Sequence, residues 1–259
     1  LDTNTHVYQA LFRSPAWTSE FRAVPLNADG GVGTISWEAG AQIPSTHTDR
    51  NIKTWNGEAW DNASGSGVDF SWQTGGITTA QKTLLGDSET LLNYLRGDRS
   101  LERTSALPGG PYRARASLLG DIVNSDPHFV GPESYGYDLP GSGLSTAAKT
   151  AYTAFRTGTK RTRPKVIYVG ANDGMLHAFN ASNGQELFGY IPNIVNWSNL
   201  GSLSRPDYEH QYFDDGAIVV YKRKQTPGQN ILGGALGRGG KGSVAVDAVS
   251  DNHLPLPAI

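Results

Sequence analysis

Two groups of residues in this chain have side chains of the types that receptor binding or metal coordination requires. Arg96, Gly97 and Asp98 form a charged tripeptide of the kind that a cell-surface receptor binds when a loop presents it. His210, Asp214 and Asp215 bring an imidazole and two carboxylates into one short segment. Their oxygens would suit a hard cation if further oxygens converged on them. Both groups also have a structural interpretation, and the surrounding sequence favours it.

The tripeptide lies at the predicted end of a helix. Residues 88–96 carry three leucines on one face, a pattern typical of an amphipathic helix. Arg96 would then lie in the last turn, where the helix dipole favours a cation. Gly97 would provide the left-handed C-cap, and Asp98 would fix the next turn. We prefer this structural interpretation and keep receptor binding by Arg96, Gly97 and Asp98 as the alternative.

Asn172, Asp173 and Gly174 form a second oxygen-rich segment, which we interpret as a structural turn. Asn, Asp and Gly all tolerate the positive φ that a tight turn between antiparallel strands needs. The aspartates near His210 are interpreted in the same way, as caps of turns through hydrogen bonds to the backbone. His177 follows in the next strand, where a buried, hydrogen-bonded role is the preferred interpretation over a ligand role.

The tryptophans leave a similar choice open. An indole ring can stack on a sugar or on an aromatic cofactor. Since these residues fall in or near predicted strands, packing between sheets is the preferred interpretation. Five of the six are Trp17, Trp37, Trp55, Trp60 and Trp72.

The elements that would position these residues are short strands. Residues 166–170, 175–179 and 186–190 read as three adjacent strands, separated by turns at 172–174 and 181–184. This rhythm of strand and turn is typical of a blade in a quinoprotein-type β-propeller. A blade cannot bury both of its faces alone, so such units pack around an axis or in a stack.

The sequence therefore predicts an all-β fold with inserted helices, a modified β-propeller with quinoprotein-like blades that is incomplete in this chain. Residues 1–259 are expected to be the N-terminal part of one propeller domain. Blade-like units are expected near 15–40, 120–132, 165–191 and 215–248, and helical insertions near 78–97 and 145–157. Residues 157–163 read as a basic, solvated link, and the proline-containing tail at 254–259 reads as a poor strand.

Composition agrees with a turn-rich β protein and excludes several classes. The chain has 259 residues with 32 glycines and 14 prolines, and only 18% of its residues are charged. A formal net charge of −2 gives no electrostatic basis for binding nucleic acid. Cysteine is absent, which excludes disulfides and thiolate zinc sites. No apolar run approaches the roughly 20 residues of a transmembrane helix.

Several sequence blocks, in a fixed order, resemble the C-terminal propeller domain of the PilC/PilY type IV pilus adhesin family. They are Y-L-R-G-D at 94–98, L-G-D-I-V-N-S-D-P at 119–127 and Y-V-G-A-N-D-G-M-L-H-A-F at 168–179. The resemblance implies the first half of that domain, in a Gram-negative protein at the pilus tip or outer cell surface. It also implies roles in pilus biogenesis, twitching motility and adhesion.

The partners implied by the resemblance are minor pilins of the pilus tip complex and a host or abiotic surface. Family members often carry a calcium loop of the D-x-[DN]-x-[DN]-G type. This sequence contains no such loop, so no metal and no cofactor are predicted.

Two functions remain in competition at this level. The first is a non-enzymatic adhesin and pilus biogenesis factor, because no catalytic set is bracketed by an identifiable motif. The second is a quinoprotein dehydrogenase that uses pyrroloquinoline quinone, which the blade rhythm alone suggests. The first is preferred, since the chain has no cysteine for a disulfide lid and too few blades to close a ring. Fold alone does not decide function.

Overall fold

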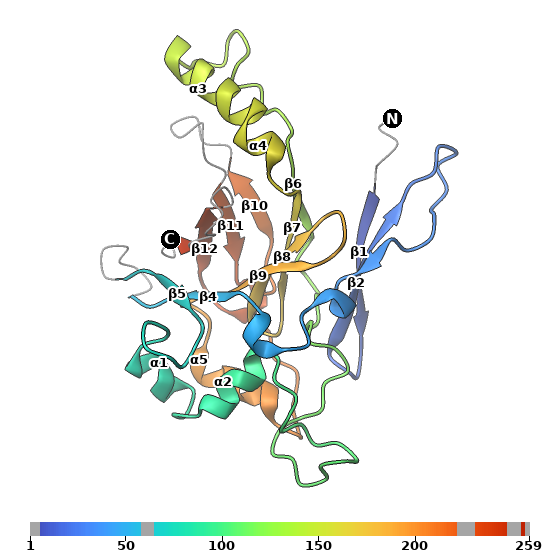
Figure 1. Ribbon diagram of the computed structural model, residues 1–259, viewed down its shortest axis with the longest axis vertical. Helices are drawn as coiled ribbons and strands as arrows, with labels where there is room; N and C mark the ends of the chain where they lie inside the picture. Colours follow the sequence, from blue (N-terminus) through green and yellow to red (C-terminus); the bar gives the residue numbers. More distant parts are fainter. Residues whose placement is uncertain (1–5, 58–64, 222–230, 248–254, 257–259) are drawn as a thin grey trace.

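A computed structural model describes residues 6–57, 65–221, 231–247 and 255–256. Its described strands form three sheets, shown side by side in Figure 1. The central sheet has six strands in the order β5-β4-β9-β8-β7-β6. A three-stranded sheet, β1-β2-β3, flanks it on one side, and a four-stranded sheet, β10-β11-β12-β13, flanks it on the other.

The predicted meander is confirmed as three adjacent antiparallel strands at the centre of the six-stranded sheet. They are β7 (Val166–Ala171), β8 (Met175–Asn180) and β9 (Glu186–Ile191). On one outer side, β6 (His128–Val130) pairs antiparallel with β7. On the other, β4 (Ile52–Trp55) runs parallel to β9 and carries β5 (Gly67–Asp69) on its far edge.

Both faces of the meander are buried, because each packs against a different neighbouring sheet. Tyr168 and neighbours of the same parity contact Ile218 and Leu232 of the four-stranded sheet. Ile167 and the alternate residues on the same face of the strand point toward the three-stranded sheet, where Phe21 is fully buried. A strand buried on both faces reads as a continuous apolar run, and the V-I-Y-V-G-A sequence of β7 has that form.

The outer sheets contain both expected and unexpected strands. In the three-stranded sheet, β2 (Thr18–Pro25) is close to its predicted position, and β3 (Trp37–Glu38) is a two-residue remnant of the strand expected there. The expectation missed β1 (His6–Arg13), which pairs with β2 along its whole length. The four-stranded sheet contains β10 (Ile218–Tyr221), β11 (Ile231–Ala235) and β12 (Ser243–Asp247).

The C-terminal tail contributes one very short strand. Pro255–Leu256 forms β13, a two-residue strand that pairs with β12 through Val246 and Ala245. A pairing of only two residues agrees with the prediction of a poor strand, and proline is tolerated there because β13 is an edge strand.

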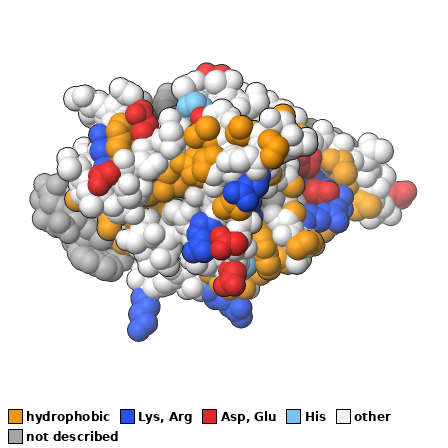
Figure 2. All heavy atoms as spheres, turned by 90° about the horizontal axis from the view of Figure 1, so that it is seen from below, with side chains coloured by type: hydrophobic (Ala, Val, Ile, Leu, Met, Phe, Trp, Pro, Cys, Tyr) orange, Lys and Arg blue, Asp and Glu red, His pale blue; other side chains and the backbone are white. Residues whose placement is uncertain are grey.

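Helices lie at both ends of the sheets. The lower end in Figure 1 carries α1 (Thr79–Leu84), α2 (Glu89–Arg96) and α5 (Trp197–Leu200), with the 3-10 turn Gly201–Ser204 after α5. Leu92 and Trp197 of these helices share an apolar core with Ile52 and Met175 of the sheet. Viewed from below, hydrophobic side chains on this end alternate with charged groups (Figure 2).

Local signals placed two of these helices correctly. Thr78 and Gln81 form a capping box at the start of α1, in which each side chain bonds the other's backbone. Ser88 caps α2 through the backbone N–H of Leu91, and Gly97 ends the helix with φ of +119°. These caps explain why the helices begin and end where the sequence indicated.

The helical arm between β6 and β7 departs from expectation in its second part. The predicted helix is present as α3 (Thr146–Thr157) and projects from the sheets (Figure 1). Residues 157–163 were expected to be a solvated link, and this is wrong. They contain α4 (Thr159–Thr162), whose Lys160 is only 1% exposed and lies 3.9 Å from the centre of the Tyr135 ring. The cation–π contact and burial of the lysine stem outweigh the preference of its charge for water.

The turn between β7 and β8 gives a first prediction. Gly174 has φ of +90°, and a Cβ added there would lie 2.7 Å from Leu200 Cδ2. Gly174→Val therefore combines backbone strain with a steric clash, and we expect it to lower the free energy of unfolding by about 2–4 kcal/mol. Urea unfolding measures the loss.

A matched variant separates the two causes. Gly75 has φ of +85° with no atom within 4 Å of a built Cβ, so Gly75→Val introduces the strain without the clash. We expect it to cost less than Gly174→Val. Equal losses would show that the contact with Leu200 has no energetic role.

Candidate functional site

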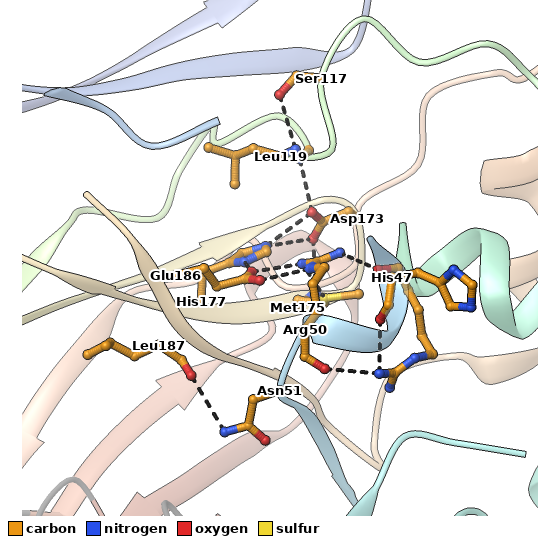
Figure 3. Close-up of polar contacts among 12 residues, drawn as sticks. His47, Arg50, Asn51, Ser117, Leu119, Asp173, Met175, His177, Glu186 and Leu187 are labelled. Carbon is orange, nitrogen blue, oxygen red and sulfur yellow. Dashed lines mark hydrogen bonds and ion pairs between the residues drawn. The ribbon is translucent and has the colours of Figure 1, made fainter. Parts of the chain in front are cut away.

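The most concentrated polar feature is a row of four charged side chains beneath the β7–β8 turn (Figure 3). Arg50 precedes β4, Glu186 begins β9, His177 lies within β8 and Asp173 lies in the turn. Arg50 donates from Nε and Nη2 to the two Glu186 oxygens, each at 2.7 Å. His177 bridges the carboxylates, with Nδ1 2.9 Å from Glu186 Oε1 and Nε2 3.1 Å from Asp173 Oδ2.

The row is buried, so its charges depend on one another. The side chains of Arg50 and Glu186 are each 1% exposed, and that of His177 is fully buried. Burial alone would lower the pKa of His177, but the Asp173 and Glu186 carboxylates outweigh it and raise the pKa to about 9. Burial would raise the pKa of Glu186, but Arg50 and His177 hold it at about 2. Two cations and two anions therefore form a neutral set.

Arg50 also connects this row to the tripeptide that the sequence singled out. Its Nη1 donates to the Arg96 carbonyl oxygen at 2.8 Å, and Arg96 Nη2 donates to the Arg50 carbonyl oxygen at 2.9 Å. Arg96 Nη1 also donates to the Phe70 carbonyl oxygen at 2.6 Å. The Arg96 side chain is thus directed inward, where it donates hydrogen bonds to backbone carbonyl oxygens before β4 and after β5.

The other two members of the tripeptide have local structural roles as well. Gly97 caps α2, and Asp98 Oδ1 accepts a hydrogen bond from the Ser100 backbone N–H at 2.8 Å. This geometry favours the structural interpretation of the tripeptide. Receptor binding by Arg96, Gly97 and Asp98 stays a prediction.

A second polar group lies at the junction between the sheets. Asn172, in the β7–β8 turn, donates from Nδ2 to Asp121 Oδ2 at 2.7 Å and accepts from the Phe213 backbone N–H at 3.0 Å. His210 Nε2 lies 2.8 Å from the same Asp121 oxygen. Asp215 accepts from the Asn124 backbone N–H at 3.0 Å. These bonds fasten the segment before β10 to the central sheet.

His210, Asp214 and Asp215 are therefore adjacent in sequence but serve different partners. Asp214 is 2% exposed, and its Oδ2 has no hydrogen-bond partner in the part of the chain that the structure describes. Burial, together with the Asp173 and Asp215 carboxylates, raises the pKa of Asp214 to about 7. Burial without a donor at Oδ2 therefore favours the protonated form of this carboxyl group.

Neither group has the features of an assembled catalytic or metal centre. Among the described residues, no cluster of three or more His, Cys, Asp or Glu side chains is positioned to hold a metal ion. His177 is fully buried and has no exposed surface through which a substrate could reach it. The role that the geometry supports for these charged groups is structural, because their mutual bonds hold the β7–β8 turn and the strands around it in place.

The tryptophans are divided between packing and partial exposure. Trp37 and Trp55 are each 6% exposed, as packing between elements requires, whereas Trp17 and Trp72 are half-buried. Trp60 lies outside the described residues.

Sequence reasoning missed Arg50 and Glu186 as members of a site. Glu186 carried a usable signal, since a carboxylate beginning an apolar strand needs a partner when it is buried. Arg50 carried none, because nothing local distinguishes it from a surface arginine. The hydrogen-bonded ion pair between Arg50 and Glu186 joins residues that are 136 positions apart.

These observations define a class of protein. It is a mainly β protein with inserted helices, in which mostly antiparallel sheets pack side by side and buried polar residues fix the β7–β8 turn and the junction with the segment before β10. A family model described as the PilY1 beta-propeller domain matches residues 119–258. The chain belongs to the PilY1 family, whose members are type IV pilus biogenesis factors.

Individual relatives extend the similarity across the chain. A type IV pilus biogenesis factor PilY1 homolog of Xylella fastidiosa is 35% identical over 99% of this chain and 19% of its own length. PilY1 of Pseudomonas aeruginosa strain UCBPP-PA14 is 30% identical over 96% of this chain and 22% of its own length. The chain spans about a fifth of the length of these relatives. No solved structure matches it significantly.

The charged row gives a second prediction, on pH. The pKa of His177 is about 9 in the folded protein and about 6.5 in the unfolded chain. The stabilising effect of the charged His177 is therefore complete below pH 6.5. That effect is lost as the pH rises from 6.5 to 9. We expect His177→Gln to flatten the decline in stability over this range and to cost about 3 kcal/mol at pH 6, measured by urea unfolding.

His128 provides the control. It lies on β6, is only half-buried, and its pKa is lowered by burial. His128→Gln should therefore leave the decline between pH 6.5 and 9 intact. A wild-type decline that survives in His177→Gln would contradict the charged state assigned to His177.

The junction gives a third prediction, on two adjacent aspartates. The unfolded chain loses the Asp214 proton near pH 3.8 but the folded chain keeps it to about pH 7, so this group lowers stability as the pH rises between them. Asp214→Asn removes this cost, and we expect it to stabilise the protein by about 1–3 kcal/mol at pH 8. Thermal and urea unfolding measure the change.

Asp215→Asn should have the opposite sign. Its carboxylate accepts from the Asn124 backbone and side chain, and an amide would set donor against donor there. We expect a loss of about 1–3 kcal/mol. Equal effects of the two substitutions would refute the difference in their surroundings.

Proposed function

We propose that this chain acts as a non-enzymatic binding scaffold in a type IV pilus-associated adhesin, at the pilus tip or outer cell surface. The observation that carries the proposal is the match of residues 119–258 to the PilY1 beta-propeller domain. The proposed partners are minor pilins of the pilus tip complex and a host or abiotic surface. No helix in the described residues has the length and apolarity to cross a membrane.

The use of the buried charges supports the scaffold role. Every member of the Arg50–Glu186–His177–Asp173 row bonds to another member, so the row stabilises the turn. A central sheet and turn fixed in this way can hold the loops around them in place, and binding residues are commonly carried on loops held by a rigid body.

A genetic experiment in the native host tests the proposal. Deleting the coding region for residues 119–258 is expected to reduce both surface pili, counted by electron microscopy, and attachment to a surface. Restoring the intact gene should recover both. Unchanged pili and attachment in the deletion strain would contradict the proposed role.

A cofactor titration tests the non-enzymatic part separately. Pyrroloquinoline quinone added to the purified protein should leave its absorbance spectrum unchanged and should support no oxidation of alcohols or sugars. Tight quinone binding with substrate oxidation would replace the scaffold proposal by the dehydrogenase alternative.

A further inference from the structure

Residues 104–111 form a loop that projects from the lower end of the molecule, where Figure 1 draws it in green after α2. The loop has the sequence T-S-A-L-P-G-G-P, and each of its residues except Gly110 is exposed. Leu107 is 38% exposed, and Ala106 and Pro108 lie on either side of it. Loops held by a fixed base are a common place for recognition residues.

The base of the loop is closed by backbone hydrogen bonds and anchored on α2. The Arg103 N–H donates to the Tyr112 carbonyl oxygen at 2.7 Å, and the Tyr112 N–H donates to the Leu101 carbonyl oxygen at 3.2 Å. The Tyr112 ring packs on Tyr94 of α2, with ring centroids 5.0 Å apart. Its hydroxyl oxygen lies 2.7 Å from Thr90 Oγ1 of the same helix. The loop therefore leaves the body of the molecule from a fixed position.

The apex of the loop is held as well, through hydrogen bonds that close within it. The Leu107 N–H donates to the Thr104 carbonyl oxygen at 3.1 Å, and the Gly110 N–H donates to the Leu107 carbonyl oxygen at 3.0 Å. Arg103 Nε donates to the Gly110 carbonyl oxygen at 3.0 Å. The ring of Pro108 restricts the backbone further. A loop that holds its shape before binding loses less conformational entropy when it binds.

The accessible charge beside the loop is positive. Residues 99–116 contain four arginines and one carboxylate. That carboxylate, Glu102, is 3% exposed and accepts from Arg115 Nε at 2.7 Å. Arg103 is exposed, and its two terminal nitrogens make no hydrogen bond or ion pair within the part of the chain that the structure describes. Arg99 is 44% exposed and lies 4.0 Å from Glu102. A surface complementary to this region would be acidic.

These features together select the kind of partner. A loop of fixed shape with a leucine at its apex matches a cleft of fixed shape, which a protein surface offers and a fluid lipid layer does not. Residues 104–111 also contain no aromatic side chain, which segments at a membrane interface usually carry.

We propose that residues 103–111 dock into an apolar cleft of a protein partner whose rim carries carboxylates. Leu107 fills the cleft, with Ala106 and Pro108 at its edges, and Arg103 pairs with a rim carboxylate. This inference rests on the proposed function for the identity of the partner, a minor pilin of the pilus tip complex. It assigns the contact with that pilin to one loop of the scaffold.

Binding of the purified protein to each purified minor pilin of the native host, measured by biolayer interferometry, tests the contact. At least one pilin is expected to bind the wild-type protein. Leu107→Gln should weaken that binding by about tenfold or more, because no apolar side chain is left to fill the cleft. Leu107→Met keeps an apolar side chain of similar volume and should bind within about threefold of wild type.

Two substitutions at Arg103 test the acidic rim. Arg103→Gln removes the charge, so we expect the affinity to fall and to depend less on salt concentration. Arg103→Lys keeps the charge and should retain the salt dependence. Equal losses of affinity and of salt dependence in both variants would overturn the ion pair, since Arg103 would then act only through its bond to Gly110.

The helical arm at the opposite end of the molecule supplies matched controls (Figure 1). Leu139 is 59% exposed in the segment that leads to α3, and Arg161 is exposed on α4. Leu139→Gln and Arg161→Gln should leave pilin binding unchanged. Thermal unfolding checks that each variant is folded.

Several outcomes would overturn the proposal. These are no pilin binding by the wild-type protein, wild-type affinity in Leu107→Gln, or an equal loss of affinity in Leu139→Gln. Binding to phosphatidylglycerol vesicles, or self-association in sedimentation, that is lost in Leu107→Gln would replace the pilin by a lipid surface or by a second copy. Failure of the proposed pilus function appears instead as unchanged pili in the strain that lacks residues 119–258, so the two failures are distinguishable.

Discussion

The mutual dependence of Arg50, Glu186, His177 and Asp173 is the constraint on which the rest of the structure depends. An isolated buried charge at these positions would pay a desolvation penalty of several kcal/mol, whereas the two cations and two anions together are neutral. Because its members come from β8, β9, the β7–β8 turn and the segment before β4, the set fixes their relative positions. Figure 3 shows how the side chains converge beneath one turn.

The sheets around this row are joined by side chains as much as by strand pairing. Trp37 Nε1 donates to the Ala181 carbonyl oxygen at 3.1 Å and links the three-stranded sheet to the end of β8. Asn172 and Asp215 perform the same task toward the segment before β10. In this chain, buried polar side chains therefore help to hold neighbouring sheets and segments together.

Local chemistry made the meander and two helix ends predictable from the sequence. The Asn172-Asp173-Gly174 turn, the Thr78–Gln81 capping box and the Gly97 C-cap are each determined by residues within a few positions. The parallel pairing of β4 with β9 could not be predicted in this way, since it joins Ile52 to Gly189 across most of the chain. The strand β1 was missed because polar and apolar residues alternate only weakly along it. Its extended conformation depends on pairing with β2.

The candidate sites show the same division. Sequence identified His177, Asp173 and the aspartates near His210 as polar residues with structural roles, but it did not identify their partners. Asp214 and Asp215 are neighbours of the same type, yet Asp215 accepts from Asn124 while Oδ2 of Asp214 has no hydrogen-bond partner among the described residues. Burial and partner geometry are properties of the folded chain, so a sequence cannot show which of two adjacent aspartates has hydrogen-bond donors around its carboxylate.

The double-sided burial of β7 has a consequence for how the sequence can change. Ile167 packs with residues near the start of the chain, and its immediate neighbour Tyr168 packs with residues beyond 217. A change of side-chain volume at Ile167 therefore has to be compensated near the start of the chain. A change at Tyr168 has to be compensated beyond residue 217. Among homologues, adjacent positions of β7 should therefore covary with different sets of residues. If only one terminal segment of the chain is replaced by that of a relative, only every second residue of β7 should lose its packing partners.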